Sequence, residues 1–540
     1  MTDHSSSKSS LTLGGKAAWY ALALIGLSQA VSMMDRQILS ILMPRIKADL
    51  QVGDAEMGLL YGTVFGLFYA IFSLPLGRLA DGWNRTKQLG LSVLGWTGMT
   101  ALGGAANSFS VLAISRLGVG IGEASVQPAG FSILFDVFPK HKRGMVSAVM
   151  AAAVALGMGS ALWLGGTVAD YWDQAYALID APLGLKGWQA AFIAASIPGF
   201  ILGILLLKMK EPPRGLADGI THKEDPHPFR ESLITLTSIL PVLAWFNFAR
   251  LKVSKRDWLI NIAGGSFFIV LAIVLIDWSN GLREANAIAL SIGSLNLTGN
   301  TLQWSLVSFG SYVVLSWLQS LKYRDRSAFT LIAHSKSMTL LVMAVALQNI
   351  LNYGVMAWTP VYLMKTFNQS PTEVGLVFGA IVAGVGVIGP MISGPVSDWI
   401  NQRVAAGRIY VTLVSLITSS VLVIATFNAQ SITAFYAWFV LFSFTLTMWL
   451  PPLYACLMDL VLPRMRGIVM SYYILAITIF GLGIGPYAVG LISDTNGGNL
   501  GEAILNIYMI SPVIIILVAL LIKLFPSDEK KVLVQAKKEQ

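Results

Sequence analysis

The chain contains one segment design twice, once in each half. In both copies an Asp precedes an Arg-Gly pair by seven residues, at Asp136–Gly144 and at Asp459–Gly467. An apolar segment with a Gly and an Asp thirteen residues apart follows each copy, in the pairs Gly157 and Asp170 and Gly481 and Asp494. This duplication restricts the fold to two similar halves that run in the same order along the chain.

Apolar runs long enough to cross a membrane recur throughout both halves. The composition is 55% hydrophobic and 12% charged, with a mean hydropathy of +0.68, which leaves too little polar surface for a soluble globule. A helix needs about 20 apolar residues to cross a hydrocarbon core of roughly 30 Å. We place six spans in each half, at residues 17–43, 56–77, 88–107, 111–136, 144–169, 188–208 and at 338–363, 374–397, 409–428, 433–458, 468–492, 503–523.

An insertion at 209–337 separates the halves, and it contains two further apolar runs at 258–277 and 302–321. An even number of extra spans keeps both halves in the same orientation, so we predict an all-α membrane protein with about fourteen spans. The apolar stretch 232–250 is short and contains Pro241, and we expect it to lie along the cytoplasmic interface. The predicted organisation is a tail (1–16), a six-helix bundle (17–208), a linker (209–257), the inserted pair (258–337), a second bundle (338–524) and a tail (525–540).

The positive charges set the orientation. With the N-terminus inside, most of the 37 Lys and Arg residues fall in cytoplasmic segments, as the positive-inside rule requires. We therefore expect a multi-pass protein of the cell membrane, taken as a bacterial inner membrane, with both termini cytoplasmic. The net charge of +9 follows from this topology and from attraction to anionic lipid, and is poor evidence for nucleic-acid binding.

Other classes of function find little support in the sequence. The single Cys456 excludes an internal disulfide, and the five His residues fall in loops or tails. No nucleophile and base pair, metal-ligand cluster or phosphate-binding loop is present, so we expect neither an enzyme nor a bound metal or cofactor. Parallel halves in an apolar chain are instead typical of alternating-access transporters, with the site at the interface of the halves.

Four ionisable residues stand inside predicted spans, and all four are in the first half: Asp35, Arg36, Arg116 and Glu123. Each costs about 2.5–3.5 kcal/mol to insert, so each is a candidate functional residue. Arg116 and Glu123 are seven residues apart and share one helix face. We predict that Asp35 and Glu123 bind protons and that Arg36 and Arg116 contact an anionic substrate. The alternative is that the four form neutral pairs that fix helix packing.

The second half offers neutral candidates at the facing position. Asn349, Tyr353 and Trp358 lie on its first span at roughly helical spacing. We expect them to line the substrate cavity, and plain core packing explains them equally well.

The cytoplasmic loops repeat a Gly-x-x-x-Asp pattern at Gly77–Asp81 and at Gly394–Asp398. Gly77 would permit close helix approach, and Asp81 could accept hydrogen bonds from a helix N-terminus of the other half while Arg85 and Lys87 reach Asp136. We predict a cytoplasmic gate with the alternative of ordinary loop solvation, and its further members are Arg143, Asp398, Asp459 and Arg466.

The loop Gly77–Lys87 resembles the hallmark motif of the major facilitator superfamily, with departures at Gly82, where the family often has a basic residue, and at Asn84, where Gly is usual. Within that superfamily, Met34–Gln37 and Ser115–Ser125 look like the Spinster group. The resemblance implies proton-linked movement of sphingosine phosphate or lysophospholipid. It also implies proton-binding roles for Asp35 and Glu123, with Arg36 and Arg116 on an anionic headgroup or paired with those acids.

These observations predict a secondary transporter, expected to be a monomer, that couples an amphiphilic or organic anion to protons by rocking its two bundles. A proton symporter for small organic or aromatic carboxylates is the nearest alternative. A non-transporting receptor built on a transporter fold is an alternative of another class.

Overall fold

The computed structural model describes residues 13–139, 142–218, 226–282, 288–292, 295–462 and 465–539. Within this part of the chain, twelve helices are long and apolar enough to cross a membrane, or up to thirteen if a bent pair counts as one span. The helices α4 (Arg85–Gly104) and α12 (Gly299–Arg324) fall below that hydropathy but occupy two of the predicted spans. With them, the arrangement has the predicted fourteen.

The N-terminal half, residues 16–208, forms one helical bundle. Its helices are α1 (Lys16–Leu50), α2 (Asp54–Leu59), α3 (Phe65–Gly82), α4, α5 (Phe109–Glu123), α6 (Val126–Val137), α7 (Arg143–Ala175) and α8 (Gly187–Lys208). A π-helical turn, η1 (Leu60–Val64), joins α2 to α3 within one span, and a short 3₁₀ turn, η3 (Pro182–Gly184), precedes α8. A break after Glu123 divides another span into α5 and α6, and this break lies within the predicted charged site.

The C-terminal half, residues 336–539, repeats this arrangement. Its helices are α14 (Lys336–Thr366), α15 (Pro371–Asn401), α16 (Gly407–Phe427), α17 (Ile432–Thr447), α18 (Leu450–Asp459), α19 (Arg466–Ala476), α20 (Gly483–Thr495), α21 (Leu500–Ile507) and α22 (Ser511–Glu539). A second π-helical turn, η6 (Ile477–Leu482), joins α19 to α20, and a 3₁₀ turn, η7 (Tyr508–Ile510), precedes α22. One span of each half therefore contains a π turn, but the two spans are not repeat partners: η1 lies in the second span of the N-terminal half and η6 in the fifth span of the C-terminal half.

Polar residues at the ends of the apolar runs begin several of these helices. The side chains of Asn84, Ser108 and Ser370 accept hydrogen bonds from the backbone of the first turns of α4, α5 and α15. Such caps satisfy amide groups that have no partner inside the helix. Polar residues in the loops therefore fix where these three spans start.

The insertion contains more structure than its two spans. It comprises η4 (Leu216–Asp218), α9 (Pro228–Ile239), α10 (Leu243–Arg250), α11 (Lys255–Leu282), a hairpin of β1 (Ile288–Ile292) and β2 (Leu295–Thr298), then α12 and α13 (Arg326–Ala333). The stretch predicted as one interfacial helix at 232–250 is instead two helices, α9 and α10, bent by 105°. Pro241 lies between them and disrupts a continuous helix.

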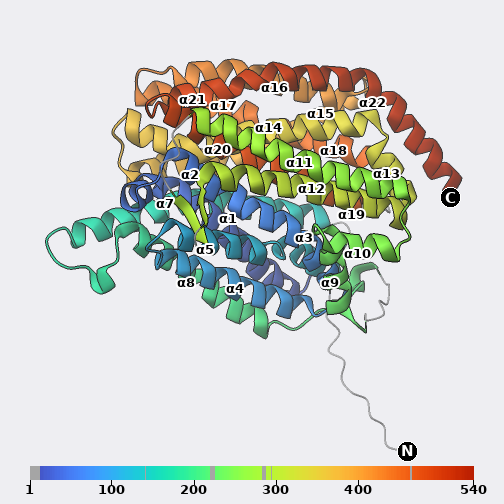
Figure 1. The fold of residues 1–540 in the computed structure, drawn as a ribbon, viewed down its shortest axis with the longest axis horizontal. Coiled ribbons are helices and arrows are strands. Elements are labelled where there is room, and N and C mark those ends of the chain that lie inside the picture. Colours follow the sequence, from blue (N-terminus) through green and yellow to red (C-terminus); the bar gives the residue numbers. More distant parts are fainter. Residues whose placement is uncertain are drawn as a thin grey trace, which may run out of the picture.

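The two bundles lie side by side, with the inserted spans across their junction. Figure 1 shows the N-terminal half in blue and teal, the C-terminal half in yellow to red, and α11 and α12 in green between them. Helix α11 is mostly exposed, and only 11% of its most apolar 18-residue segment is buried in the protein. This exposed face suits contact with lipid. Helix α12 lies inside it, against both bundles.

Candidate functional site

A buried ion pair joins α1 to the end of α5. The Nε atom of Arg36 donates to Oε2 of Glu123 over 2.6 Å, and Ser32 Oγ donates to the same oxygen over 2.8 Å. Glu123 is fully buried, while the Arg36 side chain is 21% exposed. The residue predicted to bind a proton, Glu123, and a residue predicted to contact an anion, Arg36, are therefore hydrogen-bonded to each other.

Aromatic rings hold the guanidinium group of Arg36 in place. Its Cζ atom lies 4.6 Å from the centre of the Phe65 ring and 4.4 Å from that of Tyr69. Cation–π contacts of this kind are worth about 2 kcal/mol or more when desolvated. Arg36 thus has an aromatic support that is independent of its acidic partner.

The second charged pair is arranged differently. Arg116 Nη1 donates over 2.8 Å to the backbone carbonyl of Asp35, and its guanidinium group lies 5.0 Å from the Phe192 ring centre. Neither carboxyl oxygen of Asp35 has a hydrogen-bond partner of ordinary geometry among the described residues, and the same holds for Nε and Nη2 of Arg116. The site therefore contains a buried carboxyl group and a buried guanidinium group with unused hydrogen-bonding capacity.

Helix α4 adds two residues to this site that the sequence did not single out. Trp96 and Thr100 face the carboxyl group of Asp35, and both are fully buried. They are four residues apart and therefore share a helix face. The signal in the sequence was a Trp and a Thr four residues apart in a span, which place an indole N–H and a hydroxyl group on one helix face.

The three candidates from the second half lie in different surroundings. Tyr353 is close to Arg36 and Tyr69 across the interface of the halves. Asn349 donates to the Val345 carbonyl of its own helix over 2.9 Å. Trp358 is fully buried, and its indole N–H donates to Pro486 O over 2.8 Å. Tyr353 therefore faces the charged site, and Trp358 packs within the C-terminal half.

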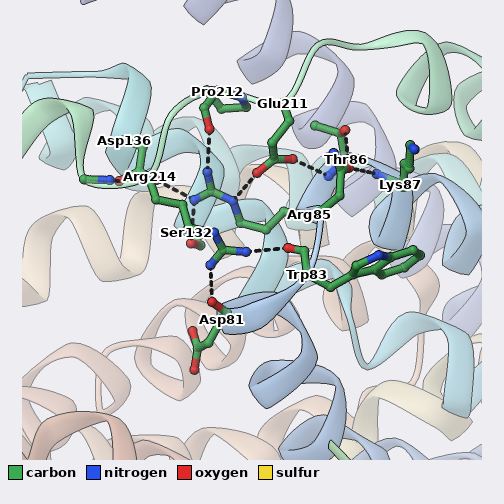
Figure 2. Close-up of polar contacts among 12 residues, drawn as sticks. Asp81, Trp83, Arg85, Thr86, Lys87, Ser132, Asp136, Glu211, Pro212 and Arg214 are labelled. Atoms are coloured by element: carbon green, nitrogen blue, oxygen red, sulfur yellow. Dashed lines mark hydrogen bonds and ion pairs between the residues drawn. The ribbon is translucent and has the colours of Figure 1, made fainter. Parts of the chain in front are cut away.

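A polar network occupies the end of the N-terminal half where α3 meets α4, which we call the gate end. Arg85 donates to Asp136 over 2.5 Å and to Glu211 over 2.7 Å, with further bonds to Ser132 and the Pro212 carbonyl (Figure 2). The predicted contact between Arg85 and Asp136 is present. Glu211 comes from the linker and was not predicted.

Other predicted gate residues surround this network. Gly77 faces Pro128 of α6, and Lys87 is exposed on the first turn of α4, so the predicted reach of Lys87 to Asp136 is not seen. Arg143 donates to the Phe135 carbonyl over 3.0 Å. The carbonyl of Asp81 accepts from Arg214 over 2.5 Å. Burial and then the nearby Arg85 charge lower the pKa of Arg214 below that of a free arginine.

The second half has a corresponding but smaller cluster. Arg408 donates to Asp398 over 2.8 Å and also pairs with Asp459. Gly394 faces Pro451 just as Gly77 faces Pro128. The side chain of Arg466 lies outside the described residues. The ion pairs of Arg85 and Arg408 each join residues of one half or its linker, so they brace the separate bundles at the gate end.

Contacts between the halves close the other end of the molecule. The carboxylate of Asp494 accepts from the backbone N–H groups of Asp54 and Ala55 over 3.0 and 2.9 Å. In the symmetric position, Asp170 accepts from the N–H and hydroxyl groups of Thr372 over 3.2 and 2.6 Å. Each carboxylate thus binds the N-terminus of a helix in the opposite half, where the helix dipole favours negative charge.

Close helix packing supports this closure. A Cβ atom built on Gly58 would lie 2.4 Å from the Pro486 carbonyl oxygen, and one on Gly159 would lie 2.9 Å from that of Gly379. Only glycine permits such approaches. We call the end that contains Asp54, Asp170, Thr372 and Asp494 the closed end.

One cavity lies away from the charged residues. It has a volume of about 520 Å³ and is bordered by α10, α11 and α12, with Trp245, Asn261 and Tyr312 among its lining residues. Its walls are largely apolar, and the three polar groups bond to one another. The charge chemistry of the site therefore gives a better guide to function than cavity size does.

Known proteins share this fold. A bacterial homologue of the human lysosomal transporter Spinster, solved in an inward-facing unoccupied conformation, superimposes with a TM-score of 0.65. It is 20% identical, and the alignment covers 96% of this chain and 98% of the other. At this identity the match shows the fold alone.

Several sequence relatives are transporters or efflux proteins by name. An MFS-type efflux pump of Mycolicibacterium smegmatis is 24% identical, over 91% of this chain and 88% of the relative. Protein spinster of Drosophila melanogaster is 26% identical over 40% of this chain and 34% of its own length. The sphingosine-1-phosphate transporter SPNS2 of Danio rerio is 28% identical over 37% of each chain. These relatives confirm the predicted likeness to Spinster proteins.

The sequence pattern described as Major Facilitator Superfamily matches residues 25–476 and 338–540, which together take in nearly the whole chain. This match agrees with the duplicated bundles and with the transporter relatives. The chain is therefore a multi-pass membrane protein that belongs to the major facilitator superfamily of transporters.

Proposed function

We propose that this transporter couples an amphiphilic or organic anion to protons by alternating access. The observation that carries the proposal is the buried group of Asp35, Arg36, Arg116 and Glu123, which lies in one half and faces Tyr353 of the other. Charges at this depth are costly unless they are used or paired. A substrate at this place would contact both halves.

Glu123 and Arg36 supply a way to couple the binding of a proton to the binding of an anion. A proton on Glu123 removes the charge that holds Arg36, and the guanidinium group is then free to bind an anionic headgroup. Release of both the substrate and the proton restores the Glu123 carboxylate and its ion pair with Arg36. The rings of Phe65 and Tyr69 keep the guanidinium group in position in both situations.

Asp35 and Arg116 supply a second exchange point. Burial of a polar group without a hydrogen bond costs roughly 2–7 kcal/mol, and burial of a charged carboxylate costs more. Proton uptake removes that cost and permits a closed, water-free state. The unused Nε and Nη2 atoms of Arg116 lie side by side on the guanidinium plane, which suits two oxygen atoms of a phosphate or carboxylate.

Two substrate classes fit this donor arrangement. A lysophospholipid or sphingoid phosphate is our first candidate, because spinster and SPNS2 are relatives and the site combines cations with aromatic rings. Small organic carboxylates are the second. They are favoured by partial matches to a probable L-galactonate transporter of Escherichia coli and a probable galactarate/D-glucarate transporter of Bacillus subtilis.

We further propose that the chain acts as a monomer in a bacterial inner membrane with both termini cytoplasmic. The gate end, which carries the Arg85 network, then faces the cytoplasm and the closed end faces outward. The charge distribution supports this orientation.

Proton movement in proteoliposomes that enclose a pH dye tests the proposal. The vesicles are challenged in turn with lysophospholipid, sphingoid phosphate and small aliphatic or aromatic carboxylates. We expect a pH change with one class, lost in Glu123→Gln and in Asp35→Asn. Glu373→Gln, at the exposed start of α15, is the matched control and should behave as wild type.

The outcomes separate the alternatives. A pH change with carboxylates alone would favour the second substrate class. Substrate movement without a pH change would overturn proton coupling. Binding without movement of either substrate or protons would favour a receptor on a transporter fold.

A further inference from the structure

Helix α12 of the insertion packs against both halves of the transporter. A Cβ atom built on Gly310 would lie 2.8 Å from Leu67 of the N-terminal half and 3.1 Å from Ile479 of the C-terminal half. Val313 of α12 is buried in an apolar cluster with α3, α9 and η6. Trp317 stacks on Tyr472 of α19 with ring centres 6.0 Å apart. The helix therefore covers the seam between α3 and α19–α20.

Toward the closed end, α12 forms polar contacts with the two π turns. The Nε2 atom of Gln303 donates to the carbonyl of Gly483, directly after η6, over 2.8 Å. Its Oε1 atom lies 2.5 Å from the hydroxyl group of Thr63, which belongs to η1. One buried amide thus connects the π turn of the N-terminal half to the residue directly after the π turn of the C-terminal half.

Thr63 strengthens this connection. Its hydroxyl group also lies 2.5 Å from the Gly483 carbonyl, so its single hydrogen is shared between Gly483 and Gln303. Gln303 is fully buried, where broken hydrogen bonds are not replaced by water at no cost. The three groups form a closed polar triangle with one corner in each half and one in the insertion.

A neighbouring contact extends this arrangement. Asn300 of α12 accepts from Tyr487 of α20 over 2.7 Å, and the ring of Tyr487 packs edge-on against Trp304 at 5.7 Å. Together these residues place α12 on α20 while Thr63 connects it to η1.

We propose that Gln303 is a positioning residue of the transport cycle. It makes the inserted pair a third component of the closed end, and it stabilises the state in which that end is shut. The proposal rests on alternating access as proposed above, because the two π turns must separate when the closed end opens. If α12 moves with the N-terminal half, Gln303 loses its contact with Gly483. If α12 moves with the C-terminal half, Gln303 loses its contact with Thr63.

π-helical turns are frequent at functional sites because their backbone hydrogen bonding is locally irregular. Here one such turn lies in each half, and Gln303 contacts the first turn and the residue that follows the second. A side chain that connects these two segments acts on the equilibrium between the shut and the open state of the closed end.

Spin-label distances in the full chain test the proposal without any substrate or proton gradient. Labels go on Gln51 and Thr495, which are exposed at the closed end in opposite halves, in a Cys456→Ala background in nanodiscs. Because Cys456 is the single native cysteine, only the two introduced sites react. We compare Gln303→Met with wild type and expect the ratio of long to short distances to rise about fivefold, the effect of one net buried hydrogen bond of ordinary strength.

Gln319→Met is the matched control. Gln319 lies on the same helix and is buried, but it bonds to Asn261 and to the Asp257 carbonyl within the insertion. This variant should keep the wild-type distances. Thr63→Val, which conserves shape, should raise the long-distance fraction as Gln303→Met does, and it tests the same triangle if Gln303→Met fails to fold.

An unchanged distribution in Gln303→Met would overturn the proposal, and so would an equal rise in Gln319→Met, which would indicate general loosening of the inserted pair. The measurement reports opening alone. A transporter that fails to move protons could therefore still show the expected shift, and the two proposals fail independently.

Discussion

The two bundles repeat one architecture but differ in the chemistry of their centres. In the N-terminal half, α1 and α5 contribute Asp35, Arg36, Arg116 and Glu123. The facing helix of the C-terminal half, α14, presents neutral groups, and there Gln348 donates to Asn352 over 3.4 Å. Among the residues that the structure describes, the two bundles share a shape while only the N-terminal one contains buried acidic or basic side chains. The difference teaches that bundle packing and ion chemistry are separable in this protein.

The largest effect should come from breaking the buried pair in the charged half. Arg36→Gln leaves the fully buried Glu123 carboxylate without its ion-pair partner, which costs about 3–5 kcal/mol of unfolding free energy. Glu123→Gln leaves the partly exposed Arg36 and should cost less. The double variant should recover much of that loss. Gln348→Met in the neutral half should cost about 1 kcal/mol. Denaturant unfolding in detergent measures all four variants, and additive single losses would contradict a coupled pair.

The gate-end clusters offer a second contrast between the halves. Arg85 is 1% exposed and bonds to four groups, whereas Arg408 is 21% exposed and pairs with two carboxylates. Arg85→Lys loses the forked donor geometry in a buried place and should cost about 2–3 kcal/mol. Arg408→Lys should cost about 0.5–1 kcal/mol, because its partner Asp398 is 56% exposed and solvent screens the pair. Equal losses of unfolding free energy would show that burial does not distinguish the two clusters.

Substrate binding should show a third, smaller contrast. Arg116→Lys keeps the charge but loses paired donors, so the Michaelis constant for an anionic substrate should rise about tenfold, or about 1.4 kcal/mol. Asn349→Ala should change it less than about twofold, because the Asn349 amide already bonds to its own helix. Initial transport rates in proteoliposomes measure both. A larger rise in the Michaelis constant for Asn349→Ala than for Arg116→Lys would indicate that the substrate binds mainly to the C-terminal half.

The closed end is the place where the halves should behave alike. Asp494→Asn and Asp170→Asn each weaken a helix N-terminus in the opposite half, at a cost of about 1 kcal/mol. The spin-label distances between positions 51 and 495 should therefore shift toward opening by a similar, modest amount in both variants. A shift in only one of them would show that the repeat symmetry does not extend to this end.

The sequence predicted more of the fold than of the site. Apolar runs near 20 residues, the repeated Asp-to-Arg-Gly spacing and the loop motif were sufficient for two bundles plus an inserted pair. The 105° bend between α9 and α10 was missed, because the short length and Pro241 indicated only that the stretch 232–250 lies along the interface. The β1–β2 hairpin was missed as well, since it falls in a loop with no motif of its own.

The site was only partly predictable. Helical spacing placed Arg116 and Glu123 on one face, but it did not reveal that Glu123 pairs with Arg36 or that Arg116 binds the Asp35 backbone. It also could not separate Tyr353, which faces the charges, from Trp358, which packs in the core. Those distinctions depend on rotation of each helix against its neighbours.

By itself, the sequence determined that this chain spans a membrane, that its halves are duplicates, and that the charged residues in the middle of its bundle spans belong to one half. Hydropathy and periodicity act within single helices, so these properties are local. The tertiary structure alone decided that Asp170 and Asp494 bind helix ends across the interface and that Gln303 of α12 connects both bundles. Such contacts join residues hundreds of positions apart, and only the packing of whole helices brings them within hydrogen-bonding distance.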